Sequence, residues 1–423
     1  MNFIFISPGF PENYQYFCKG LKKNGVNVLG IADMPYEELS EELKACLTEY
    51  YRVDQLQNYE EVLKAVGFFT FKYGKIDWIE SNNEFWLEQD AKLRTDFHVT
   101  TGFQMDDMDK VKRKSVMKLY YQKAKIPCAP CHIVTTLEEG KEFASQVGYP
   151  VIVKPDNGVG ANHTWRIENE RELNAFYGEL KEGQLTECYV MEPFIDGEIC
   201  SYDAIINKEG EPLLETGNIT PISIMDAVNE QSDVYFYIVP ELKEDIKEAG
   251  RNCIKAFGVK SRFVHFEFFR LKKDQKGIGK KGQLVGLEVN MRPSGGYTPD
   301  MMNFSMDTDV YQCWADMVVF DSIKTTRAKE TYYCVYVGRR WKYEYAHDDK
   351  DVWGKYGSNI KMATELPEVI AYGMGDYMCI ARFKEKQEME EFIQFLLEKK
   401  TEEKQKGIKK GQIRGKKVLK REK

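Results

Sequence analysis

The sequence predicts an α/β protein that begins with a parallel, doubly wound sheet. Short apolar strands such as "NFIFI" and "VNVLGIAD" alternate with helical segments in the first hundred residues, a pattern typical of βαβ units. Later, "SRFVHFEFFRL" and "LVGLEVNMRP" flank a Lys/Gly-rich loop, which predicts an antiparallel hairpin. Two further strands and the amphipathic helix "EKQEMEEFIQFLLEKK" follow and predict a small C-terminal α+β domain.

The first strand and helix follow each other in the order expected of a nucleotide-binding domain. "ENYQYFCKGLKKNG" predicts a helix that ends at Gly25, and "KIDWIESNNE" is a later strand that leads into a helix. The turn after the first strand reads Ser7-Pro8-Gly9-Phe10-Pro11. It lacks the G-x-G-x-x-G fingerprint of dinucleotide-binding sheets, so the sequence does not favour an NAD-dependent dehydrogenase.

The character of the chain changes at Asp109. "DKVKRKSVMKLYYQKAK" predicts one basic helix, and "TTLEEGKEFASQVG" predicts a second helix with a capping threonine. "YPVIVKP" predicts a strand that runs into a glycine-containing turn. "CYVMEPFIDGEICSYDAII" predicts two strands joined by a bend, and "PELKEDIKEAGRNCIKAFGV" another helix before the hairpin.

Composition is that of an ordinary globular protein with several domains. The chain has 423 residues, of which 43% are hydrophobic and 30% charged. It contains no run of 18 apolar residues, and its first residues lack a basic leader. The ten cysteines are scattered, which favours reduced thiols in a cytoplasmic protein. Cys128 and Cys131 form a single C-x-x-C without a second pair, so we expect packing roles for both.

Charge is unevenly distributed. The net charge is −7, yet residues 399–423 contain twelve Lys or Arg and three Glu, which leaves the rest near −16. A basic tail of this kind is typical of contacts with nucleic acid or anionic membranes. This tail has no aromatic residues or apolar periodicity, so we expect a solvated, disordered end. With an acidic body, neither a nucleic-acid nor a membrane partner is expected.

The hairpin carries an unusual polar stripe. Glu288, Asn290 and Arg292 occupy every second position of an apolar strand, and such positions share one face. If the two strands pair, Glu267 faces Glu288 and Asn290. Two carboxylates and an amide oxygen suit Mg²⁺ or Mn²⁺. The alternative is an ordinary solvated sheet face, although unpaired acids among so many apolar residues would be costly.

Basic residues and glycines upstream suit a phosphate ligand. Lys154 ends the apolar strand "YPVIVKP", and Gly158 and Gly160 follow it. A fixed ammonium and exposed backbone N–H groups are typical of phosphate binding. Lys114 is a second candidate cation, whose alternative role is a solvated helix face. The turn does not match the Walker-type P-loop pattern.

The bend "MEPFIDGE" could accommodate an adenosine group. A strand edge of this kind can offer backbone N–H and C=O groups to an adenine, with apolar side chains on either side of the ring and a nearby carboxylate to hold the ribose. Glu192 and Glu198 lie at the two ends of this bend. By itself the segment favours the simpler interpretation, a hairpin with acidic residues.

In sequence order these elements resemble the ATP-grasp superfamily. The resemblance runs from about Asp109 to Val319 and is closest to carboxylate–amine ligases and to the biotin carboxylase and carbamoyl-phosphate synthetase branch. It implies two α+β subdomains that clasp ATP, preceded by a Rossmann-like domain. The domains expected on this basis are residues 1–108 (N-terminal), 109–190 (lid subdomain), 191–328 (metal and catalytic subdomain), 329–398 (C-terminal) and 399–423 (tail).

The resemblance also implies roles for individual residues. Lys114, Lys154, Gly158, Gly160, Glu192, Phe194 and Glu198 would bind ATP. Glu267, Glu288 and Asn290 would hold Mg²⁺ or Mn²⁺. Arg292 and Lys154 would be catalytic, and His265, Ser294 and Gly295 would contact substrate, with a core or supporting role as the alternative for His265.

The activity implied is that of an ATP-dependent ligase. A carboxylate would be activated as an acyl phosphate and transferred to an amine, giving ADP and phosphate, with small-molecule substrates and a possible homodimer. Two alternatives stay open: another phosphoryl-transfer enzyme, either a kinase or a bicarbonate-using carboxylase, or an ATP-binding regulatory protein without turnover. No Met-Lys-Met biotin-attachment sequence is present.

Overall fold

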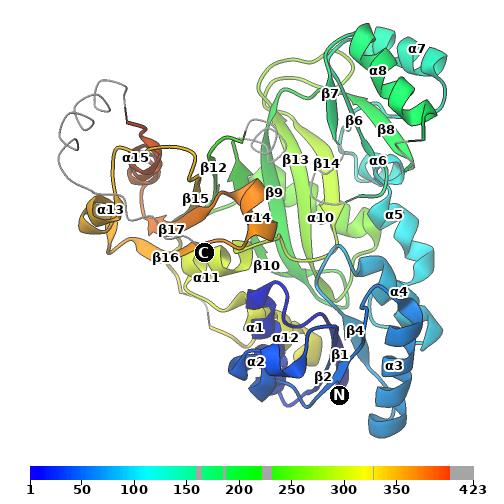
Figure 1. Ribbon diagram of the computed structural model, residues 1–423, viewed down its shortest axis with the longest axis vertical. Coiled ribbons are helices and arrows are strands. Elements are labelled where there is room, and N and C mark those ends of the chain that lie inside the picture. The colour runs from blue at the N-terminus through cyan, green and yellow to red at the C-terminus, as the bar shows by residue number, and fades with distance from the viewer. Residues whose placement is uncertain (159–163, 184–186, 222–230, 327, 401–423) are drawn as a thin grey trace, which may run out of the picture.

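A computed structural model of the chain describes residues 1–158, 164–183, 187–221, 231–326 and 328–400. Figure 1 shows the N-terminal sheet at one end, a small sheet with two helices at the other, and a large sheet between them. The α/β fold with its parallel first sheet is confirmed. Gly160 and residues 401–423 of the basic tail lie outside the described residues. None of the described helices combines the length and apolar character needed to cross a membrane.

The N-terminal domain is a parallel sheet with the strand order β3-β2-β1-β4. Its elements are β1 (Asn2–Ile6), η1 (Glu12–Tyr14), α1 (Gln15–Lys23), β2 (Asn27–Ala32), η2 (Tyr36–Glu38), α2 (Glu41–Cys46), β3 (Glu49–Arg52), α3 (Tyr59–Tyr73), β4 (Trp78–Glu80), α4 (Leu87–Asp96) and η3 (Met105–Asp107). Apolar side chains fill both faces of the sheet, as expected for parallel strands.

The small subdomain is an antiparallel sheet with the order β5-β8-β6-β7. Its elements, with the helices before it, are α5 (Met108–Lys112), α6 (Lys114–Lys123), β5 (His132–Ile133), α7 (Leu137–Val147), β6 (Val151–Pro155), β7 (Trp165–Ile167), α8 (Glu170–Lys181) and β8 (Tyr189–Pro193). The expected boundary at residue 190 needs correction, because it falls inside β8, which belongs to this sheet. Cys128 and Cys131 are partly buried free thiols.

The large sheet is antiparallel and has the order β14-β13-β9-β11-β12-β15-β17-β16, with β10 beside β9. Its strands are β9 (Gly197–Ile206), β10 (Pro212–Thr216), β11 (Asn218–Thr220), β12 (Val234–Ile238), β13 (Arg262–Leu271), β14 (Leu284–Asn290), β15 (Tyr333–Arg339), β16 (Ile360–Glu365) and β17 (Tyr377–Phe383). The C-terminal strands were expected to form a separate domain. Instead, β15 pairs with β12 and extends this sheet.

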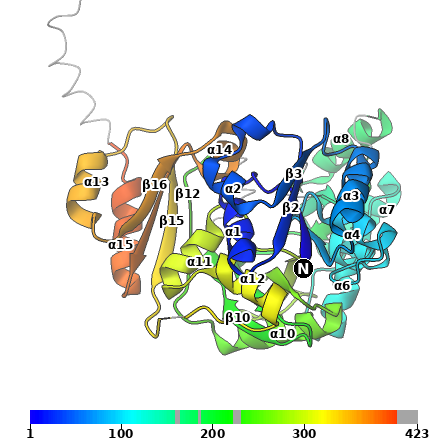
Figure 2. The same ribbon diagram turned by 90° about the horizontal axis from the view of Figure 1, so that it is seen from below.

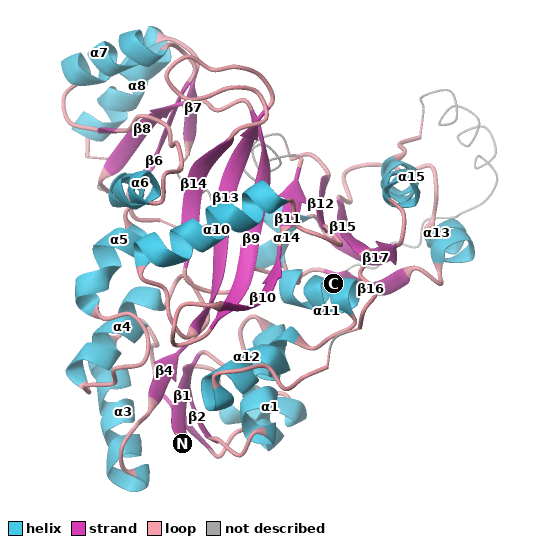
Figure 3. Cartoon of the chain, turned by 180° about the vertical axis from the view of Figure 1, so that it is seen from behind, coloured by secondary structure: helices cyan, strands magenta, loops and turns pink. Residues whose placement is uncertain are grey.

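Helices cover both faces of the large sheet. They are α10 (Glu244–Phe257), α11 (Thr298–Met306), α12 (Val310–Phe320), α13 (Asp349–Tyr356), α14 (Glu368–Met374) and α15 (Lys386–Leu397). α10 and α14 lie on opposite faces (Figures 1 and 3). Figure 2 shows α12 beside α1. Gly20 permits this close approach, because a Cβ there would lie 2.9 Å from the Cβ of Ala315.

The single basic helix predicted after Asp109 is in fact two helices. Arg113 has extended backbone angles (φ −92°, ψ 115°) that end α5, and α6 begins at Lys114. Buried Asp156, from the end of β6, accepts hydrogen bonds from the Ser115 N–H (2.8 Å) and from Arg113 Nε (2.9 Å). A carboxylate at a helix N-terminus satisfies free N–H groups and complements the helix dipole. The break therefore joins α6 to the small sheet.

We predict that Asp156→Ala lowers the free energy of unfolding by about 2 kcal/mol, because it leaves buried donors without their acceptor. Urea denaturation measures the loss. Asp109→Ala is the matched control, since Asp109 lies 3.9 Å from Arg113 but is largely exposed. An equal loss in both variants would contradict the capping role of Asp156.

Candidate active site

A cavity of about 560 Å³ lies between the small subdomain, the large sheet and α14. Its walls come from segments far apart in the sequence: the start of α6, the bend between β8 and β9, the β13–β14 hairpin, and α14. Ten of the predicted site residues line it: Lys114, Lys154, Glu192, Phe194, His265, Glu267, Asn290, Arg292, Ser294 and Gly295.

Three more of the predicted residues, Gly158, Glu198 and Glu288, are not part of this lining. Gly158 accepts a hydrogen bond from Lys114 Nζ through its C=O (3.0 Å). Glu198 is absent from the cavity lining, although Gly197 and Ile199 are part of it. Successive side chains of a strand point to opposite faces, so Glu198 faces away from the cavity. The prediction that Glu198 holds a ribose needs correction for this reason.

The hairpin pairs in the register that its polar stripe predicted. Glu267 lies opposite Glu288, and His265 lies opposite Asn290. Lys114 Nζ lies 3.2 Å from Glu288 Oε1. Burial opposes ionisation of Glu267, but His265 more than offsets it, and the pKa of Glu267 is lowered.

The donor set fits a hard divalent cation only in part. Among the described residues, no three His, Cys, Asp or Glu side chains gather closely enough to bind a metal by themselves. Glu267, Glu288 and Asn290 provide two carboxylates and an amide oxygen, which is the oxygen chemistry of Mg²⁺. Mg²⁺ commonly keeps several water or phosphate ligands, so this small set is compatible with Mg²⁺ bound together with a phosphate.

Glu192 is held by two buried lysines. Its carboxylate lies 2.8 Å from Lys118 Nζ and 2.9 Å from Lys154 Nζ, and all three side chains are buried. Burial alone would raise the pKa of Glu192, but the two ammonium groups lower it to about 2. The same contact raises the pKa of Lys154 despite burial. Lys154 is therefore a cation at neutral pH.

His265 is held in place by an acid behind it. Its Nδ1 lies 2.8 Å from Asp203 Oδ1, and its Nε2 lies 3.5 Å from Glu267 Oε1. Ser201 donates to the other oxygen of Asp203. Burial would lower the pKa of His265, but Asp203 and Glu267 raise it to about 10. His265 is thus a fixed, charged side chain at the edge of the cavity.

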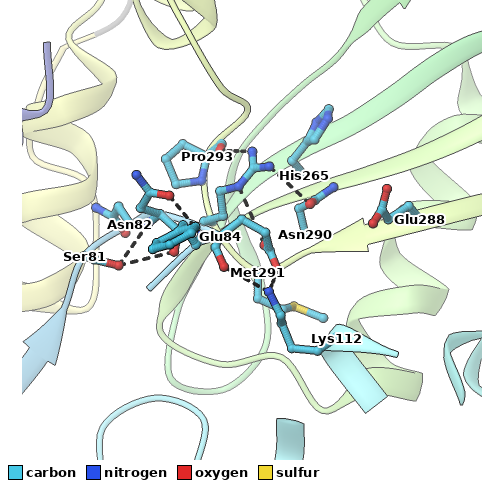
Figure 4. Close-up of polar contacts among 12 residues, drawn as sticks. Ser81, Asn82, Glu84, Lys112, His265, Glu288, Asn290, Met291 and Pro293 are labelled. Carbon is cyan, nitrogen blue, oxygen red and sulfur yellow. Dashed lines mark hydrogen bonds and ion pairs between the residues drawn. The ribbon is translucent and has the colours of Figure 1, made fainter. Parts of the chain in front are cut away.

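Arg292 meets a carboxylate of the N-terminal domain. Its Nη1 donates to the Pro293 C=O (2.7 Å) and its Nη2 to Asn290 Oδ1 (3.2 Å). Its Nε lies 3.7 Å from Glu84 Oε2, and Lys112 Nζ lies 3.1 Å from Glu84 Oε1. Figure 4 shows Glu84 between Lys112 and the end of the strand. These contacts fix the direction of the guanidinium group.

The bend between β8 and β9 uses the backbone of Phe194 internally. Its N–H donates to the Pro150 C=O (3.0 Å), and its C=O accepts from Gln275 Nε2 (3.0 Å). Gln275 Oε1 accepts from the Asp196 N–H (2.9 Å). Within the described part of the chain, the Ile195 N–H has no acceptor, and Ile195 lines the cavity. The sequence had suggested the backbone of Phe194 as the group that binds a ligand. The backbone N–H without an acceptor is instead that of Ile195.

Several residues of this site were missed by sequence reasoning. Lys118 lies four residues after Lys114 on α6, a spacing that places both on one helix face, so a signal was available. Glu84, Asp203 and Gln275 lie far along the chain from their partners, and the sequence carries no local signal for these contacts.

The chain is similar to known proteins over this region. Residues 147–299 match the family model described as the ATP-grasp domain. The chain is 24% identical over 337 residues to an L-arginine-specific L-amino acid ligase of Bacillus subtilis, covering 76% of each protein.

Two solved structures share the fold. An L-amino acid ligase from Bacillus licheniformis has a TM-score of 0.68 at 15% identity, covering 93% of this chain and 96% of that one. An N5-carboxyaminoimidazole synthetase from Staphylococcus aureus has a TM-score of 0.65 at 14% identity, with the same coverage. At these identities the likeness concerns the fold alone.

We predict that Glu192→Gln lowers the free energy of unfolding at pH 7 by about 3 kcal/mol, because two buried ammonium groups lose their counter-charge. Since the folded-state pKa of Glu192 is depressed, its contribution is present above its ordinary pKa. It is lost as pH falls towards about 2. Urea denaturation should show that the difference in free energy of unfolding between wild type and variant becomes smaller below about pH 4.5.

Glu179→Gln serves as the control, because Glu179 is exposed on α8 of the same subdomain. Its effect should be close to zero at every pH. If the loss of free energy of unfolding in Glu192→Gln stayed the same as pH fell towards about 2, the depressed pKa of Glu192 would be contradicted.

Proposed function

Because the chain belongs to the ATP-grasp superfamily of ATP-dependent ligases, we propose that it joins a carboxylate substrate to an amine. The observation that supports this most is the gathering of Lys114, Lys154 and Arg292 around one cavity with Glu267 and Asn290. Cations and hard oxygen ligands placed together suit the transfer of a phosphoryl group. ATP and small-molecule substrates follow from this proposal.

In the proposed reaction, a substrate carboxylate oxygen attacks the γ-phosphorus of ATP, and ADP leaves. The amine nitrogen then attacks the acyl carbon, phosphate leaves, and the nitrogen loses a proton. Lys114 and Lys154 bind phosphate oxygens. Arg292 stabilises the charge that grows on the acyl and phosphate oxygens, since its guanidinium is already oriented by Glu84.

Glu267, Glu288 and Asn290 would hold Mg²⁺ in this proposal. When bound, the ion neutralises charge on the phosphates. The contact between Lys114 and Glu288 would then exchange for contacts of each group with phosphate and cation.

Adenine recognition falls to the bend between β8 and β9. The Ile195 N–H has no acceptor among the described residues, and Ile195 lines the cavity together with Phe194 and Ile152. The side chain of Gln275 accepts from the Asp196 N–H and donates to the Phe194 C=O. The bend is thereby held with one edge towards the nucleotide.

The names of the relatives suggest the class of substrate. Two of them are described as L-amino acid ligases, so we propose that at least one substrate is an L-amino acid. A homodimer stays a prediction.

Two other functions are less well supported. A kinase would give a phosphorylated product, and a carboxylase would require bicarbonate. A regulatory protein that only binds ATP does not need Arg292 fixed beside the predicted metal ligands. Phosphate release screened over carboxylate and amine pairs with Mg-ATP, with mass spectrometry of the product, separates these functions.

We predict that Gln275→Glu raises the KM for ATP about tenfold with little change in kcat, because a carboxylate oxygen would face the Phe194 C=O and disturb the bend. Steady-state kinetics at saturating co-substrates measures both constants. Lys276→Ala, an exposed change in the same loop, should leave both unchanged. A fall in kcat alone would argue against a role in nucleotide binding.

We predict that Arg292→Ala and Glu288→Ala each reduce substrate-dependent phosphate release by about 100-fold or more, because charge stabilisation at the reacting phosphoryl group is lost. Arg270→Ala is the matched control, since Arg270 lies on β13 but pairs with Asp245 on α10. If both site variants released phosphate at the wild-type rate, the ligase assignment of this cavity would be wrong.

A further inference from the structure

One part of the cavity has an apolar wall. Phe236 of β12 and Ile370 and Met374 of α14 line it. Ile370 and Met374 are four residues apart and so share one face of the helix. Met374 lies next to the turn that follows Arg292, because a Cβ at Gly296 would be 3.9 Å from the Met374 Cε. The wall therefore stands beside the predicted reaction centre.

The wall is held from behind by buried polar contacts. Arg340, which is buried, donates to the C=O groups of Ala371 (3.3 Å) and Tyr372 (3.0 Å). The Tyr336 hydroxyl donates to the Met374 C=O (2.9 Å). These carbonyls belong to the last turn of α14; the Ala371 C=O also accepts from the Gly375 N–H (2.9 Å). Tyr336 also stacks on Phe236 at 4.8 Å. The strand β15 and the residue after it thus hold the backbone at the end of α14 and pack against the Phe236 ring.

Several other residues of the described cavity lining are polar without a formal charge. Asn218, Thr220, Ser294 and Thr298 line the same cavity and offer hydrogen bonds. A charged side chain that packed against Phe, Ile and Met would lose its hydration against a surface that offers no charge or hydrogen bond. An apolar side chain would gain from the same burial.

We propose that the amino-acid substrate carries an apolar side chain, which packs against Phe236, Ile370 and Met374. This inference rests on the proposed ligase function and specifies its substrate class. The arrangement of the wall assigns side-chain specificity to the C-terminal segment, whose strands extend the large sheet.

The first test compares amino acids of similar size in the phosphate-release assay with Mg-ATP. Methionine and leucine should support turnover with a kcat/KM at least about 100-fold above that of glutamate or lysine, because burying a charge against apolar side chains is strongly disfavoured. Glutamine is the neutral comparison and should fall between them.

The second test changes the wall. Met374→Lys should reduce kcat/KM for methionine by about 100-fold and raise the relative rate with glutamate, because the new ammonium group pairs with an acidic side chain. Tyr372→Lys is the matched control: Tyr372 is on the same helix, 61% exposed, and outside the cavity lining. Its substrate preference should be that of the wild type. Unchanged binding of ADP to Met374→Lys, measured by calorimetry, shows that the variant is folded.

The outcomes separate this inference from the function it rests on. Turnover that prefers glutamate or lysine in the wild type would overturn the apolar wall and leave the ligase function standing. The same holds if Met374→Lys and Tyr372→Lys show the same preference. Failure of every amino-acid pair to stimulate phosphate release, in protein that binds ADP, would overturn the ligase function and this inference with it.

Discussion

The buried carboxylate of Glu192 between two ammonium groups is the constraint on which the cavity depends. It joins three elements, since Lys118 comes from α6, Lys154 from β6 and Glu192 from β8. Burial by itself would drive the lysines towards their neutral forms. With one acid for two bases, the cluster carries a net positive charge inside the protein. A net charge does not stabilise a protein core. This one lies beside the region where we propose that phosphates bind.

This constraint also limits which groups are available to a nucleotide base in the proposed function. A carboxylate committed to two lysines is poorly placed to serve a ligand as well, because each lost contact would leave a buried charge unpaired. In the proposed function, recognition of the base would therefore fall to the backbone at Ile195, next to the backbone groups that the side chain of Gln275 holds in place. The loop between β13 and β14 thus contributes to both ends of the site: its strands provide the predicted metal ligands and its tip supports the bend.

The parts of this site that the sequence predicted are those governed by local periodicity. Alternation along β14 placed Glu288 and Asn290 on one face, and the pairing with Glu267 followed from two strands of similar length. Glu198 was misplaced because the same alternation turns it away from the cavity. The helix break at Arg113 could not be predicted from a proline or glycine, because neither occurs there. It depends on Asp156, which follows a strand of the small sheet.

The order of strands in the large sheet has a similar explanation. The segment "TYYCVYVG" predicts a strand, but the sequence does not show which strand it pairs with. Its pairing with β12 makes it part of the large sheet and not of a separate one. This has a functional consequence, because Tyr336 and Arg340 then reach α14 and set the apolar wall.

The N-terminal domain takes part in the site although its own sheet contributes no phosphate-binding turn. Arg262 of β13 pairs with Glu80 at the end of β4 and donates to the Met291 C=O (2.6 Å). These contacts fix the backbone one residue before Arg292, and Glu84 then orients the guanidinium itself. A guanidinium that is already aimed needs no reorganisation when negative charge develops beside it. The N-terminal domain is therefore better understood as the support of the proposed catalytic arginine than as a separate binding module.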